Sequence, residues 1–114
     1  MKTFRYILAF GSNLGDRLAH CQKALRLLQP YINLLKESRK LVTEPLRSGL
    51  YVTDDHGWYL NFVVDAESNL TPLEFYAVIY EIENFIGHNR VRKWAPRKID
   101  IDILLFNNEV IDSK

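Results

Sequence analysis

Apolar positions along the chain change their spacing several times, and each spacing predicts a different element. Residues 6–10 are apolar on both faces, as in a strand buried at the centre of a sheet. Residues 59–67 alternate between apolar and polar, which predicts a strand with one buried face. Shorter patterns predict strands at 38–43 and 99–106, and a short extra strand from residue 109.

Two other segments carry apolar residues at helical spacing. The first follows Asp16, a residue that can cap a helix, and Pro30 ends it. Its apolar stripe consists of Leu18, Cys21, Leu25 and Leu28. The second opens at Thr71, with a proline at its first position and a glutamate three residues after the cap, and Gly87 closes it. Its stripe consists of Phe75, Ile79, Ile82 and Ile86.

The predicted order of elements is β-α-β-β-α-β, which is the ferredoxin-like arrangement. We therefore expect an α+β sandwich in which an antiparallel four-stranded sheet carries two helices on one face, as a single domain over residues 1–114. The opposite face of the sheet would be free for a ligand or a partner. Because this fold serves many functions, the function has to be argued from particular side chains.

Composition narrows the class of protein. The formal net charge is +1 at pH 7, which argues against a general polyanion binder. Cys21 is the only cysteine, so no disulfide can form within the chain, and a reducing, cytoplasmic setting fits best. The apolar run at residues 6–10 is too short for a signal-peptide core or a membrane span, so we expect no membrane contact.

The predicted strand at residues 99–106 carries the strongest candidate for chemistry. Asp100 and Asp102 are two residues apart, so they project from one face of the strand, with α-carbons roughly 7 Å apart. Two neighbouring carboxylates repel each other unless a cation lies between them. Mg²⁺ typically takes one or two carboxylates together with phosphate oxygens. A solvated strand face would show the same alternation, so the neighbouring residues decide between the two interpretations.

The segment just before the aspartates is strongly basic, with positive charges at Arg90, Arg92, Lys93, Arg97 and Lys98. Cations beside an acidic metal site are what phosphoryl transfer requires, because metal and guanidinium groups together neutralise charge on the transferring and leaving oxygens. A solvated basic loop or a nucleic-acid patch is a common alternative. Neither alternative explains the paired aspartates that follow.

A third candidate lies on the alternating strand. Tyr59 and Asn61 share one face, where a planar heterocycle could stack on the ring and hydrogen-bond to the amide. Thr43 and Leu46 flank Pro45 and could offer backbone groups to the same ligand. Taken alone, a surface tyrosine with a polar neighbour is the commoner explanation for this pair.

The glycine-containing segment at residues 11–15 has a simpler interpretation. It lacks the Lys-Ser/Thr ending of a P-loop and the third glycine of a dinucleotide-binding loop. We therefore expect it to be a structural turn, with glycine for unusual dihedrals and Asn13 for local hydrogen bonds.

Taken together, these segments resemble the family of 6-hydroxymethyl-7,8-dihydropterin pyrophosphokinases of bacterial folate synthesis. The matching pieces occur in the family's order over nearly the whole chain, at residues 10–17, 43–46, 59–61, 82–83 and 94–106. The last block is highly specific, because it combines a tryptophan, a Pro-Arg pair and two alternating aspartates on an apolar strand.

The resemblance implies a reaction in which the hydroxymethyl oxygen of the pterin attacks the β-phosphorus of ATP, and AMP leaves. By matching position, Asp100 and Asp102 would hold two Mg²⁺ ions, and Arg97 would contact the phosphates in the transition state. The residues implied to bind the pterin are Thr43, Leu46, Tyr59, Asn61 and Trp94, with Trp94 closing over the site on a mobile loop. The residues implied to lie by the nucleotide are Glu83, Arg90 and Ile103, and those implied to assist Arg97 are Arg92 and His88.

Two departures from the family pattern bear on activity. Many relatives have an arginine directly after the glycine that ends the second helix, whereas this chain has His88, which is shorter and mostly neutral at pH 7. Family members also continue past the position of Lys114, with groups for ATP and an aromatic ring for the pterin. We therefore expect residues 1–114 to lack that wall of the site, which a second subunit in a homo-oligomer could supply.

Two other function classes stay open on the sequence. A pterin- or nucleotide-binding relative with weak or no catalysis is favoured by His88 and opposed by the intact Arg97 and paired aspartates. An RNA-binding module of the RRM type shares the order of elements, but it wants an aromatic-rich basic motif on its third strand. Asn61 and Asp65 stand on that strand here, so we expect pterin and ATP as partners and no nucleic acid.

Overall fold

One antiparallel sheet forms the base of the molecule in the computed structural model, which describes residues 2–43, 58–87, 98–107 and 109–110. Its central strand β1 (Phe4–Ser12) lies between β4 (Tyr59–Ser68) and β5 (Asp100–Phe106). The outer strands are β2 (Asn33–Glu37) and β3 (Leu41–Thr43), which both pair with β4, and β6 (Glu109–Val110), which pairs with β5. This order confirms the predicted ferredoxin-like arrangement, and β6 confirms the short extra strand predicted from residue 109.

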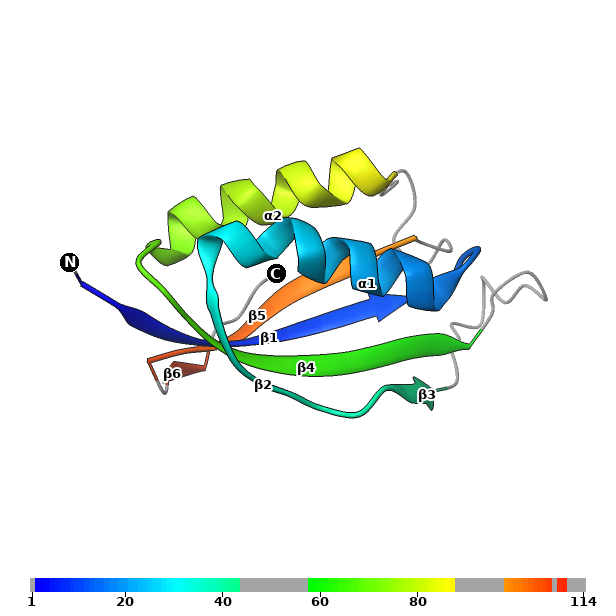
Figure 1. The fold of residues 1–114 in the computed structure, drawn as a ribbon, viewed down its shortest axis with the longest axis horizontal. Coiled ribbons are helices and arrows are strands. Elements are labelled where there is room, and N and C mark those ends of the chain that lie inside the picture. The colour runs from blue at the N-terminus through cyan, green and yellow to red at the C-terminus, as the bar shows by residue number, and fades with distance from the viewer. Residues whose placement is uncertain (1, 44–57, 88–97, 108, 111–114) are drawn as a thin grey trace.

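Two helices cover one face of this sheet (Figure 1). They are α1 (Arg17–Leu28), which runs into a short 3-10 turn at Gln29–Tyr31, and α2 (Pro72–Ile86). Both helices begin where the sequence predicts. The Asp16 side chain accepts a hydrogen bond from the Ala19 N–H at 3.1 Å. Thr71 and Glu74 form a reciprocal capping box, and Gly87 ends α2 in a left-handed conformation at φ 118°.

The core lies between the helices and the sheet and follows the predicted alternation. Side chains at every second position of β1, β4 and β5 are buried beneath α1 and α2. Phe10 and Phe62 stack across the β1–β4 pair, with ring centroids 4.8 Å apart. The remaining buried apolar side chains of the three strands are Tyr6, Leu8, Leu60, Val64, Ala66, Ile101 and Ile103. The opposite face of the sheet, here called the open face, carries the alternate set of side chains.

The strand predicted at residues 38–43 differs from the observed edge. The pairing with β4 is divided between β2 and β3, and Ser38 lies at the break. Its N–H donates to the Val63 carbonyl and its hydroxyl accepts from the Val63 N–H, both at 2.8 Å. The hydroxyl takes the place of a backbone carbonyl, so the ladder is interrupted while the Val63 groups stay bonded.

One residue of the predicted apolar stripe on α1 is wrongly placed. Leu18 is 46% exposed, whereas Cys21, Ala24 and Leu28 are buried. The buried face of α1 runs along Cys21, Ala24 and Leu28, and Leu18 instead lines an open hollow together with Arg17 and Leu60. In the described part of the chain, neither helix is long and apolar enough to cross a membrane.

Candidate functional site

The register of the central strands brings the predicted site residues to the open face. Gly11 of β1 pairs with Asn61 on one side and with Asp100 on the other. Two residues earlier on β1, Ala9 lies across from Asp102. Because neighbouring strands lie about 4.8 Å apart, roughly 10 Å separates the α-carbons of Asn61 and Asp100. The open face therefore holds an amide on one side of β1 and two carboxylates on the other.

The predicted pterin-binding residues meet at the β3–β4 edge of the open face. Thr43 lies across from Tyr59 in the ladder, and the Asn61 Nδ2 donates to the Thr43 hydroxyl at 2.7 Å. Tyr59 and Asn61 are both half-buried, so each offers one surface to a ligand. The structure thus joins an aromatic ring, an amide and a hydroxyl in one cluster. Leu46, the remaining backbone candidate, lies outside the described residues.

Gly11 lies beside Asn61 and Tyr59, and the sequence analysis interpreted it wrongly as part of a turn. It lies within β1 and its dihedrals are not in the left-handed region, in contrast with Gly15 at φ 70°. A Cβ at this position would stand 3.1 Å from the Asn61 Oδ1 and 3.7 Å from the Tyr59 Cδ1. The missing side chain leaves the space in which these two groups lean over β1. Glycine inside a strand is the sequence signal for such a close approach.

The paired aspartates face the way that their spacing predicts. Asp100 and Asp102 are half-buried on the open face, whereas Ile99, Ile101 and Ile103 point into the core. Among the described residues, no group of three or more His, Cys, Asp or Glu side chains could hold a metal ion. A pair of carboxylates fits Mg²⁺, which commonly completes its coordination with phosphate oxygens and water.

The two nucleotide candidates on the described part of the chain lie on the core side. Glu83 on α2 and Ile103 on β5 are buried, so the side chain of Ile103 cannot line an open surface. The Glu83 Oε2 accepts a hydrogen bond from the Ile101 N–H at 2.9 Å, which shows that this N–H points away from β1. Since backbone groups alternate along a strand, the N–H and C=O of Ile103 point to the same edge. Contact between Ile103 and a nucleotide remains a prediction, and it would use these backbone groups.

The structure describes only the end of the basic segment. His88, Arg90, Arg92, Trp94 and Arg97 lie outside the described residues. Lys98 is described, and its side chain lies against Gly87 at the end of α2. A Cβ added at Gly87 would lie 3.1 Å from the Lys98 Cδ. A cation at a helix C-terminus is favourable. This contact brings the start of β5 next to the end of α2.

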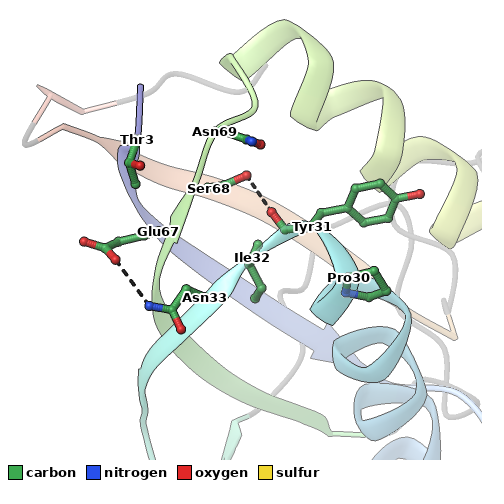
Figure 2. A pocket seen from close by; sticks show the side chains of 8 residues that line it. All are labelled: Thr3, Pro30, Tyr31, Ile32, Asn33, Glu67, Ser68 and Asn69. Atoms are coloured by element: carbon green, nitrogen blue, oxygen red, sulfur yellow. Dashed lines mark hydrogen bonds between the residues drawn. The ribbon is translucent and has the colours of Figure 1, made fainter. Parts of the chain in front are cut away.

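A hollow of about 310 Å³ lies at the other end of the sheet (Figure 2). Its polar groups already bond one another, since Asn33 Nδ2 donates to Glu67 Oε1 at 3.3 Å and Ser68 Oγ donates to the Tyr31 carbonyl at 2.7 Å. Asn61 and Glu67 are six residues apart on β4, so roughly 20 Å separates this hollow from the predicted site. None of the predicted site residues lines it.

Known proteins resemble this chain over almost its whole length. Residues 7–112 match the family model of 7,8-dihydro-6-hydroxymethylpterin-pyrophosphokinase (HPPK). The chain is similar to 2-amino-4-hydroxy-6-hydroxymethyldihydropteridine pyrophosphokinases of Aquifex aeolicus, with 36% identity over 94% of the chain, and of Bacillus subtilis, with 35% identity over 100%. It spans 64% and 66% of the length of these two relatives.

A solved structure shares the fold. A crystal structure of HPPK-DHPS in complex with substrates superimposes on 97% of this chain and 29% of its own, with a TM-score of 0.69 and 16% sequence identity. At that identity the likeness supports the ferredoxin-like fold alone.

Proposed function

This chain belongs to the 7,8-dihydro-6-hydroxymethylpterin-pyrophosphokinase family, and from that premise we propose that it transfers pyrophosphate from ATP to 6-hydroxymethyl-7,8-dihydropterin and releases AMP. The observation that carries the proposal is the arrangement of the open face. A ring, an amide and a hydroxyl stand on one side of β1, and two carboxylates stand on the other. The separation of roughly 10 Å leaves room for a pterin whose hydroxymethyl arm reaches toward a polyphosphate.

On the pterin side, the residues differ in what they contribute. Tyr59 offers a ring face for stacking, and Asn61 offers an amide held in place by its hydrogen bond to Thr43. An amide can pair with the polar edge of a pterin because it presents a donor and an acceptor side by side. In this proposal Leu46 adds a backbone contact and Trp94 covers the ring.

On the phosphate side, Asp100 and Asp102 would hold two Mg²⁺ ions. When bound, Mg²⁺ supplies charge neutralisation on the phosphate oxygens and helps to orient them. Arg97 and Arg92 supply guanidinium groups to the transferring phosphate, and Arg90 contacts the nucleotide. His88 takes the place of an arginine that many relatives carry, and the backbone of Ile103 meets the base at the β5 edge.

The open face of the sheet, where an RRM would bind RNA, does not favour the RNA-binding alternative. An RRM stacks bases on aromatic side chains of its central strands. Here the open face of β1 presents Arg5, Ile7, Ala9 and Gly11, and β5 presents Asp100 and Asp102. Apart from Tyr59 on β4, this part of the sheet offers no ring to a base and opposes phosphates with two carboxylates.

The proposal is tested by incubating the chain with ATP, Mg²⁺ and 6-hydroxymethyl-7,8-dihydropterin and measuring AMP. Asp102→Asn should lower AMP formation by at least a hundredfold, since losing a metal ligand removes several kcal/mol of transition-state stabilisation. Asp65→Asn is the matched control, because Asp65 is also on the open face but pairs with Arg5 at 2.7 Å. Pterin binding without AMP formation would instead support the catalytically weak relative that His88 favours.

A further inference from the structure

Glu83 is buried, which is rare for a carboxylate unless it is paired. Among the residues that the structure describes, it is the only charged side chain that is buried, with 2% of its surface exposed. Burial of a carboxylate is costly unless hydrogen bonds compensate it. The bond from the Ile101 N–H to the Glu83 Oε2 is 2.9 Å long, and bonds to a charged acceptor are stronger than neutral ones.

The bonded N–H belongs to the peptide that joins Asp100 to Ile101, between the two aspartates. The sheet side of β5 is held by β1 through pairs at Asp100 and Asp102. On the other edge, the described part of the chain pairs with β5 only near its end, at Leu105 and Phe106. At Ile101, the Glu83 carboxylate therefore stands where a neighbouring strand would otherwise hold the backbone.

Resting on the proposed function, we infer that Glu83 is a positioning residue for the divalent-cation site. It holds the outer edge of β5, so the backbone between Asp100 and Asp102 is fixed from both sides and the two carboxylates keep their direction. Groups that orient metal ligands typically change metal affinity or activity 10- to 100-fold when they are removed. This role differs from contact between Glu83 and a nucleotide.

Glu83 acts through the backbone and not as a third ligand. The described residues contain no cluster of three potential metal-binding side chains, so Glu83 is not grouped with the two aspartates. Its side chain comes from α2 on the core side of the sheet, whereas Asp100 and Asp102 face the open side. The chemistry that Glu83 serves is therefore recognition of a hard divalent cation by two carboxylates, whose connecting backbone Glu83 holds at the Ile101 N–H.

The test compares Glu83→Ala, Glu83→Gln and Ile82→Ala with the unaltered 114-residue chain. Mn²⁺ is the probe, and its binding is followed by the paramagnetic broadening of the Asp100 and Asp102 amide signals. Hydrogen exchange of the Ile101 amide reports the bond itself. Glu83→Gln keeps an acceptor oxygen at the same reach, whereas Ile82→Ala removes a neighbouring buried side chain and leaves the Ile101 N–H bonded.

We expect Glu83→Ala to expose the Ile101 amide to hydrogen exchange. The Mn²⁺ concentration at half-maximal broadening, here called the midpoint, should rise about 10- to 100-fold. Glu83→Gln should stay close to the unaltered chain in both measurements, and Ile82→Ala should lose stability without a change in the midpoint. The inference would be overturned if the midpoint did not change in Glu83→Ala, or if it rose as much in Glu83→Gln as in Glu83→Ala. Absence of specific broadening in the unaltered chain would overturn the metal assignment of the proposed function, and the inference with it.

Discussion

At the scale of single residues, Tyr59 and Asn61 allow the pterin assignment to be tested by the order of two effects. Tyr59→Ala removes a stacking surface worth about 1 kcal/mol beyond area burial. Asn61→Ala should cost more, at about 1–3 kcal/mol, because the polar edge of the pterin would be buried without a partner. Titration calorimetry with 6-hydroxymethyl-7,8-dihydropterin measures both. Val63→Ala, one position further along the same face of β4, is the control, and equal affinities in all three variants would place the pocket elsewhere.

Gly11 gives a second prediction at this scale. Gly11→Ala places a Cβ 3.1 Å from the Asn61 Oδ1, closer than an ordinary contact, so the amide must move by a few tenths of an ångström. We expect pterin affinity to fall about three- to tenfold, which corresponds to about 0.7–1.4 kcal/mol. The chain should still fold, because the Gly11 backbone has ordinary strand dihedrals.

A double-mutant cycle separates this effect from general damage to β1. In an Asn61→Ala background the clash at Gly11 loses its partner, so adding Gly11→Ala should reduce pterin affinity little further. Fully additive losses in the cycle would show that Gly11 acts through something other than the Asn61 amide.

The residue scale also shows what the sequence could predict about the site. The side-chain period of a strand is two, so the common face of Asp100 and Asp102 follows from spacing alone. The role of Gly11 does not, because a glycine between a strand and turn residues looks like the start of the turn. Only the pairing of Gly11 with Asn61 across the sheet reveals the close approach, and pairing is a property of tertiary structure.

At the scale of elements, local signals predicted what local interactions decide. The caps at Asp16 and Thr71 are correct because a cap is satisfied within its own first turn. The break between β2 and β3 was not predicted, since it depends on the Ser38 hydroxyl bonding Val63 across the sheet. The prediction that Leu18 is buried is wrong because helical spacing indicates a face of the helix but not which positions on that face the sheet covers.

The link between β1 and the loop before α2 carries a prediction about pH. The Tyr6 hydroxyl donates to the Leu70 carbonyl at 2.5 Å, and burial raises the pKa of Tyr6 from its ordinary value of 10.0 to about 12. The unfolded chain can then lose this proton at a pH where the folded chain retains it. The protonated Tyr6 hydroxyl therefore stabilises the folded chain fully below pH 10, and this stabilisation is lost as the pH rises to about 12.

Urea unfolding of the unaltered chain and of Tyr6→Phe checks this sign. At pH 8 the variant should be less stable by about 1–2 kcal/mol, because the Leu70 carbonyl loses its donor. The gap between the two proteins should narrow as the pH rises above 10. Tyr31→Phe is the control, since Tyr31 is exposed, and a gap that stays constant with pH would contradict the prediction.

At the scale of the whole molecule, the fold divides the proposed reaction between two edges of one face. β3 and β4 carry the residues proposed to bind the pterin, and β5 carries the aspartates. β1 runs between them, with small residues at Ala9 and Gly11. The helices and the core lie on the other face and hold the register of these strands. The topology is thus what brings residues about 40 positions apart in sequence to within roughly 10 Å.

This division predicts that the pterin and ATP bind independently of each other, whereas turnover depends on both groups of residues together. Asn61→Ala should weaken pterin binding without changing the affinity for ATP with Mg²⁺, and Asp102→Asn should do the reverse. Effects at sites this far apart without shared partners usually add within about 0.5 kcal/mol, so the double variant should show each binding loss unchanged. Turnover should instead be non-additive, because both single variants disturb one transition state in which the hydroxymethyl oxygen must meet the β-phosphorus. Calorimetry for each ligand and AMP release at saturating substrates measure the two cycles. Strong coupling between Asn61 and Asp102 in pterin binding alone would mean that the pterin reaches across β1 to the carboxylates, and that the two clusters form a single pocket.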